Sequence, residues 1–355
     1  MKTLRDESRS RLISSILAGS WRKTDFPPLA ISETQLDEVV PLLYGSGAGA
    51  LGWWRVRNTE LRTTASAEVL HQAYRLQVLQ SGIHEEKIQK VFRLLTDASI
   101  EAILVKGWAA AGLYPERGLR PYGDIDLIVR PEKFQIASSL LASPEVKDCW
   151  VDLHKHVSEL DDRPVQALFE RSTKQPLGKG SVTVLSSEDH LALLSVHLLK
   201  HGAWRPLWLC DIGAAIESLS PTFDWHICLG HNRTRVGWIT AAIGLTQKLL
   251  GAQMEHVPPE MHVDRLPEWL VLNVLRQWEQ PFAGKQPPMS HPLPMSVVLR
   301  SPGMLAEALR QRWPNPILAT VSINGQFNRL PRLPYQLGNC LARSLRFLFQ
   351  TSANG

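Results

Sequence analysis

A short apolar run that carries carboxylates places the strongest constraint on the fold of this chain. Residues 124–129 combine two aspartates with isoleucine, leucine and valine, a pattern typical of a β-strand. Because side chains alternate across a strand, Asp124 and Asp126 are expected to point to the same side. Two neighbouring carboxylates repel each other and need a counter-charge, which Mg²⁺ can supply together with substrate phosphates. The run therefore predicts a metal–nucleotide site at the end of a strand.

The segments around this run predict an α+β fold. Further β-rich runs occur at 103–105, 149–154 and 182–185, and helical periodicity separates them. Before them, residues 32–98 predict three helices, which the glycines between 45 and 52 and Gly82 are expected to separate. After them, a helix is expected from an N-cap at Ser187 to about His201, with two more over 208–219 and 238–250. We therefore expect a mixed β-sheet core with helices, flanked by helical N- and C-terminal regions.

The same pattern divides the chain into four parts. A helical N-terminal region is expected over residues 1–98, and the core with the mixed sheet over 99–186. A helical domain that closes the cleft is expected over 187–285. Residues 286–355 are interpreted as a Pro-rich linker and a basic C-terminal segment, because prolines recur between Pro287 and Pro294.

The composition indicates a globular protein with an apolar core. Of the 355 residues, 44% are hydrophobic and 21% are charged, as in ordinary globular chains. No stretch approaches the length of a membrane span, and no apolar run of signal-peptide length follows the basic residues near the N-terminus. The four cysteines lie far apart in the sequence and are interpreted as free thiols in a reducing compartment. We therefore expect a cytoplasmic protein.

The positive charge of the chain is concentrated near its end. The net charge is +5, and seven arginines but only one acidic residue, Glu307, lie from Arg300 onwards. Such a segment can meet nucleic acid, an acidic partner or anionic lipid, or it can form a solvated face. Because the arginines are spread among leucine, proline and phenylalanine, a solvated face is the favoured interpretation, and nucleic-acid binding is not predicted.

Four motifs around the predicted strand resemble those of a known family. They are a Lys-Gly turn, an Asp-x-Asp strand, an Asp-Leu-His strand, and a helix with spaced histidines before a Trp-Leu-x-Asp turn. In this chain they are Val105-Lys106-Gly107, Arg120-Pro121-Tyr122-Gly123-Asp124-Ile125-Asp126-Leu127, Asp152-Leu153-His154, and His197, Lys200 and His201 before Trp208, Leu209 and Asp211. As a set they resemble a largely uncharacterised bacterial nucleotidyltransferase-like family of the DNA polymerase beta superfamily.

The resemblance implies a Mg²⁺-dependent enzyme that moves a nucleoside monophosphate from an NTP to an acceptor on a small molecule or peptide. Asp124, Asp126 and Asp152 would be the metal ligands and catalytic residues. Asp152 would share a second metal or take the proton of the acceptor hydroxyl. The residues that would contact the nucleotide are Lys106, Gly107, Arg120, Lys200 and His201.

Two other functions stay open on the sequence. Trp108 follows Gly107 where the superfamily usually has a small residue that helps to hold the triphosphate. This favours a catalytically silent protein that binds nucleotide or a partner on the same fold. The pairs His154/His156 and His197/His201 could ligate zinc, which would favour a metal-dependent hydrolase, although no cysteine or glutamate completes either set. Lys106 and Arg120 could also form structural ion pairs or lie on the surface.

Overall fold

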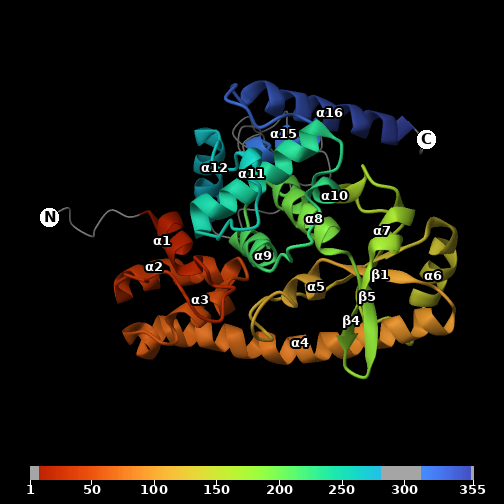
Figure 1. Cartoon of the computed structure of the whole chain (residues 1–355), viewed down its shortest axis with the longest axis horizontal. Coiled ribbons are helices and arrows are strands. Elements are labelled where there is room, and N and C mark those ends of the chain that lie inside the picture. Colours follow the sequence, from red (N-terminus) through yellow and green to blue (C-terminus); the bar gives the residue numbers. More distant parts are fainter. Residues whose placement is uncertain (1–7, 281–312, 353–355) are drawn as a thin grey trace, which may run out of the picture.

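The computed structural model describes residues 8–280 and 313–352 (Figure 1). Its architecture is α+β, as predicted, with helices before and after one five-stranded mixed sheet. The strands are β1 (Ala102–Val105), β2 (Ile125–Val129), β3 (Val151–His154), β4 (Thr173–Leu177) and β5 (Gly180–Val184). Their order in the sheet is β3-β2-β1-β5-β4, with β1–β2 and β4–β5 antiparallel and β2–β3 and β1–β5 parallel.

A single long helix connects the N-terminal helices to the sheet and runs along the lower side of the molecule in Figure 1. The prediction that Gly82 separates two helices is wrong, because this 33-residue helix continues through it. A glycine costs only about 1 kcal/mol in a helix, and the helix buries side chains on either side of Gly82, such as Leu70 and Val91. The N-terminal elements are α1 (Arg9–Leu17), α2 (Glu33–Gly45), α3 (Gly49–Val56), η1 (Glu60–Thr63) and α4 (Ala65–Asp97).

Short helices connect the strands of the core. One helix begins at Gly107, directly after β1 and Lys106, and Pro131 begins a 3-10 turn that leads into another. The connecting elements are α5 (Gly107–Ala111), η2 (Pro131–Lys133), α6 (Phe134–Leu141), η3 (Ser158–Leu160) and α7 (Val165–Arg171).

The helices after the sheet agree with the predicted periodicity, with one correction at a cap. The first of these helices begins at Ser187, so its N-cap is Ser186 and not the predicted Ser187. The Ser186 hydroxyl accepts a hydrogen bond from the backbone N–H of Asp189. These helices are α8 (Ser187–Lys200), α9 (Pro206–Glu217), α10 (Trp225–Leu229), α11 (Arg233–Leu250), η4 (Pro259–Met261), α12 (Glu268–Trp278), α15 (Pro316–Ser322) and α16 (Leu333–Ser352).

The two faces of the sheet belong to two apolar clusters. Leu104 of β1 and Leu127 of β2 pack with the second half of α4 and with α6. On the other face, Val105 and Ile128 belong to a large cluster that also includes residues of α1–α4, α8, α9, α11, α12 and α15. Asp126 lies opposite Val105 of β1 and opposite Asp152 of β3, so all three share this second face. The carboxylates therefore project from the sheet toward the helices of the C-terminal half.

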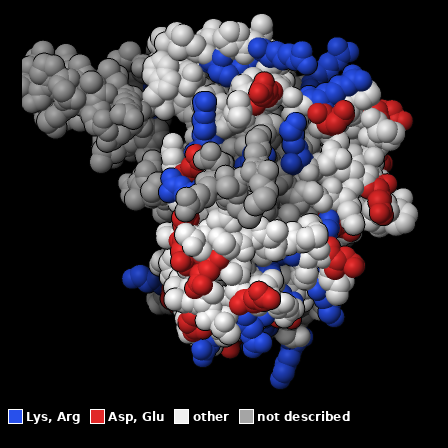
Figure 2. All heavy atoms as spheres, turned by 90° about the vertical axis from the view of Figure 1, so that its left-hand side faces the viewer, with Lys and Arg blue, Asp and Glu red and all other residues white. Residues whose placement is uncertain are grey.

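The basic C-terminal segment is not one uniform surface. Figure 2 shows lysines and arginines gathered along the upper edge of one face, at the level of α16 in Figure 1. Within this segment Arg329 is exposed, whereas Arg332 is buried and donates to the carbonyl oxygens of Gln326 and Leu330. The predicted Pro-rich linker and Arg300, Arg310 and Arg312 lie outside the described residues. Within residues 8–280 and 313–352, no helix has the length and apolar character needed to cross a membrane.

Candidate active site

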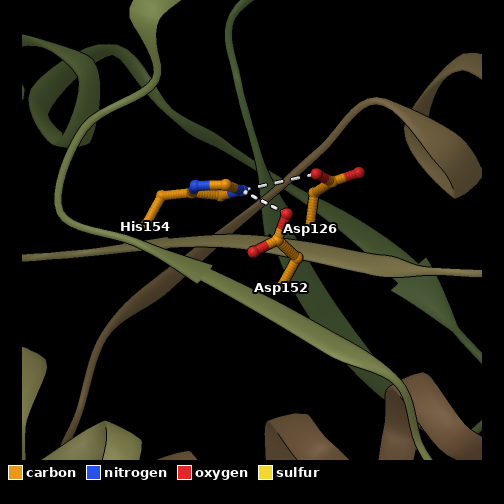
Figure 3. Close-up of side chains that lie close together, drawn as sticks. All are labelled: Asp126, Asp152 and His154. Carbon is orange, nitrogen blue, oxygen red and sulfur yellow. Dashed lines mark hydrogen bonds and ion pairs between the residues drawn. The ribbon is translucent and has the colours of Figure 1, made fainter. Parts of the chain in front are cut away.

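Two carboxylates and an imidazole converge on the sheet face that points toward the C-terminal helices (Figure 3). Asp126 comes from β2, and Asp152 and His154 come from β3, two residues apart and therefore on one side of that strand. His154 Nε2 lies 3.4 Å from Asp126 Oδ1 and 3.3 Å from Asp152 Oδ2. One ligand atom from each of the three residues lies within 4.8 Å of the others. The group therefore has the spacing needed to share one metal ion.

Lys106 supplies a further positive charge to this group. It lies between β1 and α5, where its backbone adopts a positive φ of 56° that is uncommon for a residue other than glycine. Its Nζ is 3.1 Å from Asp126 Oδ1. Burial raises the pKa of Asp126, but the hydrogen bond from His154 and the charge of Lys106 outweigh burial and lower it. Asp126 is therefore held as a carboxylate although its exposed fraction is only 5%.

The same contacts act on the two nitrogen-bearing partners of Asp126, Lys106 and His154. The hydrogen bond to Asp126 raises the pKa of His154 more than burial lowers it. Burial lowers the pKa of Lys106, but the charges of Asp126 and Glu159 outweigh burial and raise it. Lys106 and the imidazole of His154 therefore both favour the carboxylate form of Asp126.

Asp124 is exposed and lies one residue before β2. It does not belong to the group formed by Asp126, Asp152 and His154. Its backbone oxygen would lie 3.5 Å from a Cβ atom placed on Gly107, so the segment before β2 packs against the start of α5. Its charge contributes to the raised pKa of Lys106. Asp124 is thus beside the site, and its role as a metal ligand stays a prediction.

Arg120 forms a buried ion pair, one of the alternatives that the sequence left open. Its Nε and Nη2 donate to the carboxylate of Asp211 on α9, and its Nη1 donates to the carbonyl oxygen of Pro121. Tyr114 also donates to Asp211, at 2.8 Å. Because each guanidinium nitrogen has a protein partner, Arg120 in this arrangement joins α9 to the segment before β2.

The end of α8 brings a second set of ionisable groups to the site. His197 Nδ1 lies 3.0 Å from Oε1 of Glu159, a buried residue of η3. Lys200 is in the same last turn, and Glu159 is within electrostatic reach of both Lys106 and Lys200. The ring of His197 is 4.4 Å from that of His201 and 4.8 Å from that of Trp208. Lys106 therefore interacts both with Asp126 of the sheet and with Glu159, the partner of His197 on α8.

Sequence reasoning missed Glu159 and Trp150. Glu159 stands among other charged residues in a short segment without periodicity, so nothing in the sequence marks it as buried. Trp150 is 77% exposed, has a positive φ of 47°, and its carbonyl oxygen accepts a hydrogen bond from Ile125 at the start of β2. Only the pairing of β2 with β3 brings this tryptophan beside Asp124.

The structure also places the residues that favoured the alternative functions. Trp108 packs against the apolar cluster on the opposite face of the sheet, with Leu104 and Leu127. Among the described residues, the one group of three or more possible metal ligands contains His154 but not His156, His197 or His201. A cavity of about 830 Å³ between α4 and the β4–β5 hairpin is lined by residues such as Phe92, Lys174 and Val182, and none of the predicted site residues lines it.

A comparison with known protein families shows the family of the chain. A family model described as an uncharacterised nucleotidyltransferase matches residues 34–147 and 142–238. The chain belongs to this nucleotidyltransferase family. The match includes the whole sheet and every predicted site residue. No curated protein and no solved structure matches the chain.

The donor atoms of the site suit a divalent cation. Carboxylate oxygens are the preferred protein ligands of Mg²⁺ and Mn²⁺, and an imidazole nitrogen is also a suitable ligand for Zn²⁺. The carboxylates of Asp126 and Asp152 are opposite each other in the β2–β3 register. Lys106 already places one positive charge beside Asp126, and His154 adds a hydrogen-bond contact to the same oxygen. The residues present therefore fit a metal site of the kind that nucleotidyl transfer uses.

Proposed function

We propose that this protein is a Mg²⁺-dependent nucleotidyltransferase that moves a nucleoside monophosphate from an NTP to a hydroxyl or similar acceptor on a small molecule or peptide. The observation that supports this proposal is the convergence of Asp126, Asp152 and His154 beside Lys106, in a chain that belongs to a nucleotidyltransferase family. The four free cysteines fit a cytoplasmic location, where thiols stay reduced.

Each group has a part in the proposed reaction. Asp126 and Asp152 would hold the cation with His154 beside them, and Asp124 would join them from its exposed position. The bound cation would neutralise phosphate charge and stabilise the attacking and leaving oxygens of an in-line displacement. Lys106 is then released from Asp126 and pairs with a phosphate oxygen. Lys200 and His201, at the end of α8, contact the nucleotide from the other side of Lys106.

A direct test is pyrophosphate release by the full chain with ATP, GTP, CTP and UTP in turn, with Mg²⁺ and a panel of hydroxyl-bearing acceptors. We expect release with at least one NTP, and its loss in Asp126→Asn and Asp152→Asn. The control is Asp264→Asn, an exposed aspartate in the loop before α12, which should leave the rate unchanged. Silence with all four NTPs, together with no heat of Mg²⁺–NTP binding by calorimetry, would refute the proposal.

A silent nucleotide-binding protein is the second candidate. It is favoured by the pairing of Asp126 with Lys106 and His154, because this pairing balances the buried charge without any metal. It predicts that Mg²⁺–NTP binds but that no pyrophosphate appears under any condition. Tightly held zinc in stoichiometric amount in the purified protein would instead support the hydrolase alternative.

A further inference from the structure

We propose that His197 is the base that takes the proton from the acceptor hydroxyl, and that Glu159 is the residue that positions His197. This inference rests on the proposed nucleotidyl transfer and adds to it a base outside the group of metal ligands. It leaves Asp152 to the metal and assigns proton removal to the end of α8.

The hydrogen bond between the two residues selects the tautomer that a base requires. Nδ1 of His197 lies 3.0 Å from Glu159 Oε1, and a carboxylate oxygen can only accept, so Nδ1 carries the proton. The lone pair of the neutral imidazole is then on Nε2. A base that is oriented by a carboxylate in this way is a recurring arrangement in nucleophilic catalysis.

The Nε2 atom is available to a substrate. His197 contacts Glu159 through Nδ1, and its ring lies against the rings of His201 and Trp208. Within the described part of the chain, its Nε2 has no hydrogen-bond partner. A fully buried Nε2 without a partner would be one of the orphaned buried polar atoms of the described chain, and it is not one of them. The side chain of His197 is 16% exposed. Nε2 therefore faces a space that solvent reaches.

Glu159 is held in place and kept ionised. Arg235 of α11 donates to the backbone carbonyl oxygens of Ser158 and Glu159 and also pairs with Asp161. Burial raises the pKa of Glu159, but the hydrogen bond from His197 and the charge of Lys106 outweigh burial and hold it well below the usual range. A permanently ionised carboxylate is a poor base, but it stabilises the imidazolium that forms when His197 takes a proton.

Lys106 connects this pair to the metal ligands. Its ammonium group contacts Asp126 and is within electrostatic reach of Glu159. A phosphate bound by Lys106 would therefore be near both the sheet carboxylates and the His197–Glu159 pair.

The proposed step is balanced in atoms and electrons. The acceptor O–H proton moves to His197 Nε2 as the acceptor oxygen forms a bond to the α-phosphorus. The bond from the α-phosphorus to its bridging oxygen breaks, and pyrophosphate leaves with that electron pair. The imidazolium then returns its proton to solvent, which restores the neutral base.

The test uses the full chain and the NTP that supports pyrophosphate release. His197→Asn keeps an N–H group near the position of Nδ1, so the contact with Glu159 is retained while Nε2 is lost. We expect kcat to fall by at least about 100-fold, with the calorimetric affinity for Mg²⁺ and a non-hydrolysable ATP analogue unchanged. His226→Gln, which alters an exposed histidine of α10, should leave both values unchanged.

Glu159→Gln separates positioning from a purely structural role. Its amide can still accept the hydrogen bond from Nδ1, but the charge that stabilises the imidazolium is lost. We expect the acidic limb of the pH–rate profile to move to lower pH. The other ionisable groups around the pair are unchanged in this variant, so a shift of the acidic limb reports the lost carboxylate. These groups are Lys106, Asp161, Lys200, His201 and Arg235.

Each outcome is decisive. A His197→Asn rate equal to that of the wild type overturns the base assignment and leaves the proposed function intact. An unmoved acidic limb in Glu159→Gln overturns the positioning role, and it also decides the question if His197→Asn fails to fold. Nucleotide binding by the wild type without any pyrophosphate release refutes the step, whereas no Mg²⁺–NTP binding at all refutes the proposed function as well.

Discussion

The ammonium group of Lys106 lies 3.1 Å from Asp126 Oδ1, the same oxygen that His154 Nε2 approaches to 3.4 Å. One carboxylate oxygen thus has two nitrogen neighbours on one side of the sheet. Because Asp126 is buried, these neighbours stabilise its carboxylate form in the folded chain, and a cation that binds Oδ1 would compete with them. The site therefore couples stability, pH and metal binding.

Replacing Lys106 by methionine should destabilise the metal-free protein by about 2 kcal/mol at pH 7, because it leaves a buried carboxylate with one cationic partner fewer. The pKa of Asp126 is lowered in the folded state, so this stabilisation is present above the unfolded value of about 4 and is lost as the pH falls through the folded value. Urea unfolding of both proteins between pH 3 and pH 8 measures the difference.

The control for this experiment is Lys87→Met. Lys87 pairs with Asp148 on the surface, where solvent screens the interaction, so no measurable loss is expected. A Lys106→Met protein as stable as the wild type at pH 7 would show that the Asp126 contact contributes nothing to folding.

Replacing His154 by glutamine should cost more stability at pH 6 than at pH 9. The pKa of His154 is raised in the folded state, so its contribution is complete below the unfolded value of about 6.5 and disappears as the pH rises through the folded value. Urea unfolding at the two pH values checks this, with His231→Gln, in the exposed turn before α11, as the control. A loss of equal size at both pH values would contradict the charged interaction.

Replacing Arg120 by methionine should lower the free energy of unfolding by about 3 kcal/mol, because Asp211 would be left buried and without its ion pair. The affinity of the folded variant for Mg²⁺–NTP should stay within about a factor of two, since that change corresponds to less than half a kcal/mol. Urea unfolding and calorimetry give the two values. A tenfold loss of affinity with little loss of stability would instead support a phosphate contact.

Replacing Gly82 by alanine should stabilise the protein by about 0.5–1 kcal/mol, because α4 is continuous there and no atom lies within 4 Å of the added Cβ. Gly118→Ala is the opposing variant. Gly118 has a φ of +85°, and an added Cβ would lie 2.5 Å from Val78 Cγ2, so this change should destabilise. Loss of stability in Gly82→Ala by urea unfolding would contradict the continuous helix.

The sequence predicted the parts of the fold in which periodicity and burial agree. β1 and β2 are buried runs rich in apolar residues, β3 alternates apolar and polar side chains, and α8 and α11 have apolar residues at helical spacing. β4 was missed because four of its five residues are exposed and it contains Pro176, so it has neither an apolar run nor alternation. Gly82 was misread because the packing of α4 on either side of it outweighs the local preference of one glycine.

The candidate site was predictable only where its residues lie on the strands. The register of β2 and β3 brings Asp126, Asp152 and His154 together. The motifs contained all three, but the resemblance implied only the two aspartates as metal ligands. Glu159 becomes visible only when η3 packs against α8, which is a contact between distant segments. Arg120 has the chemistry of a phosphate ligand, but its partner Asp211 lies 91 positions further along the chain.

The large apolar cluster behind Val105 and Ile128 has a mechanical consequence. It extends without interruption from α1 through the Asp126 face of the sheet to α8, α11 and α15. The sheet face that carries Asp126 and the helix α8 are therefore parts of one close-packed core, and they cannot separate without exposing buried leucines to water. A core substitution as distant as Leu12 should therefore loosen the sheet face and the helices packed on it together.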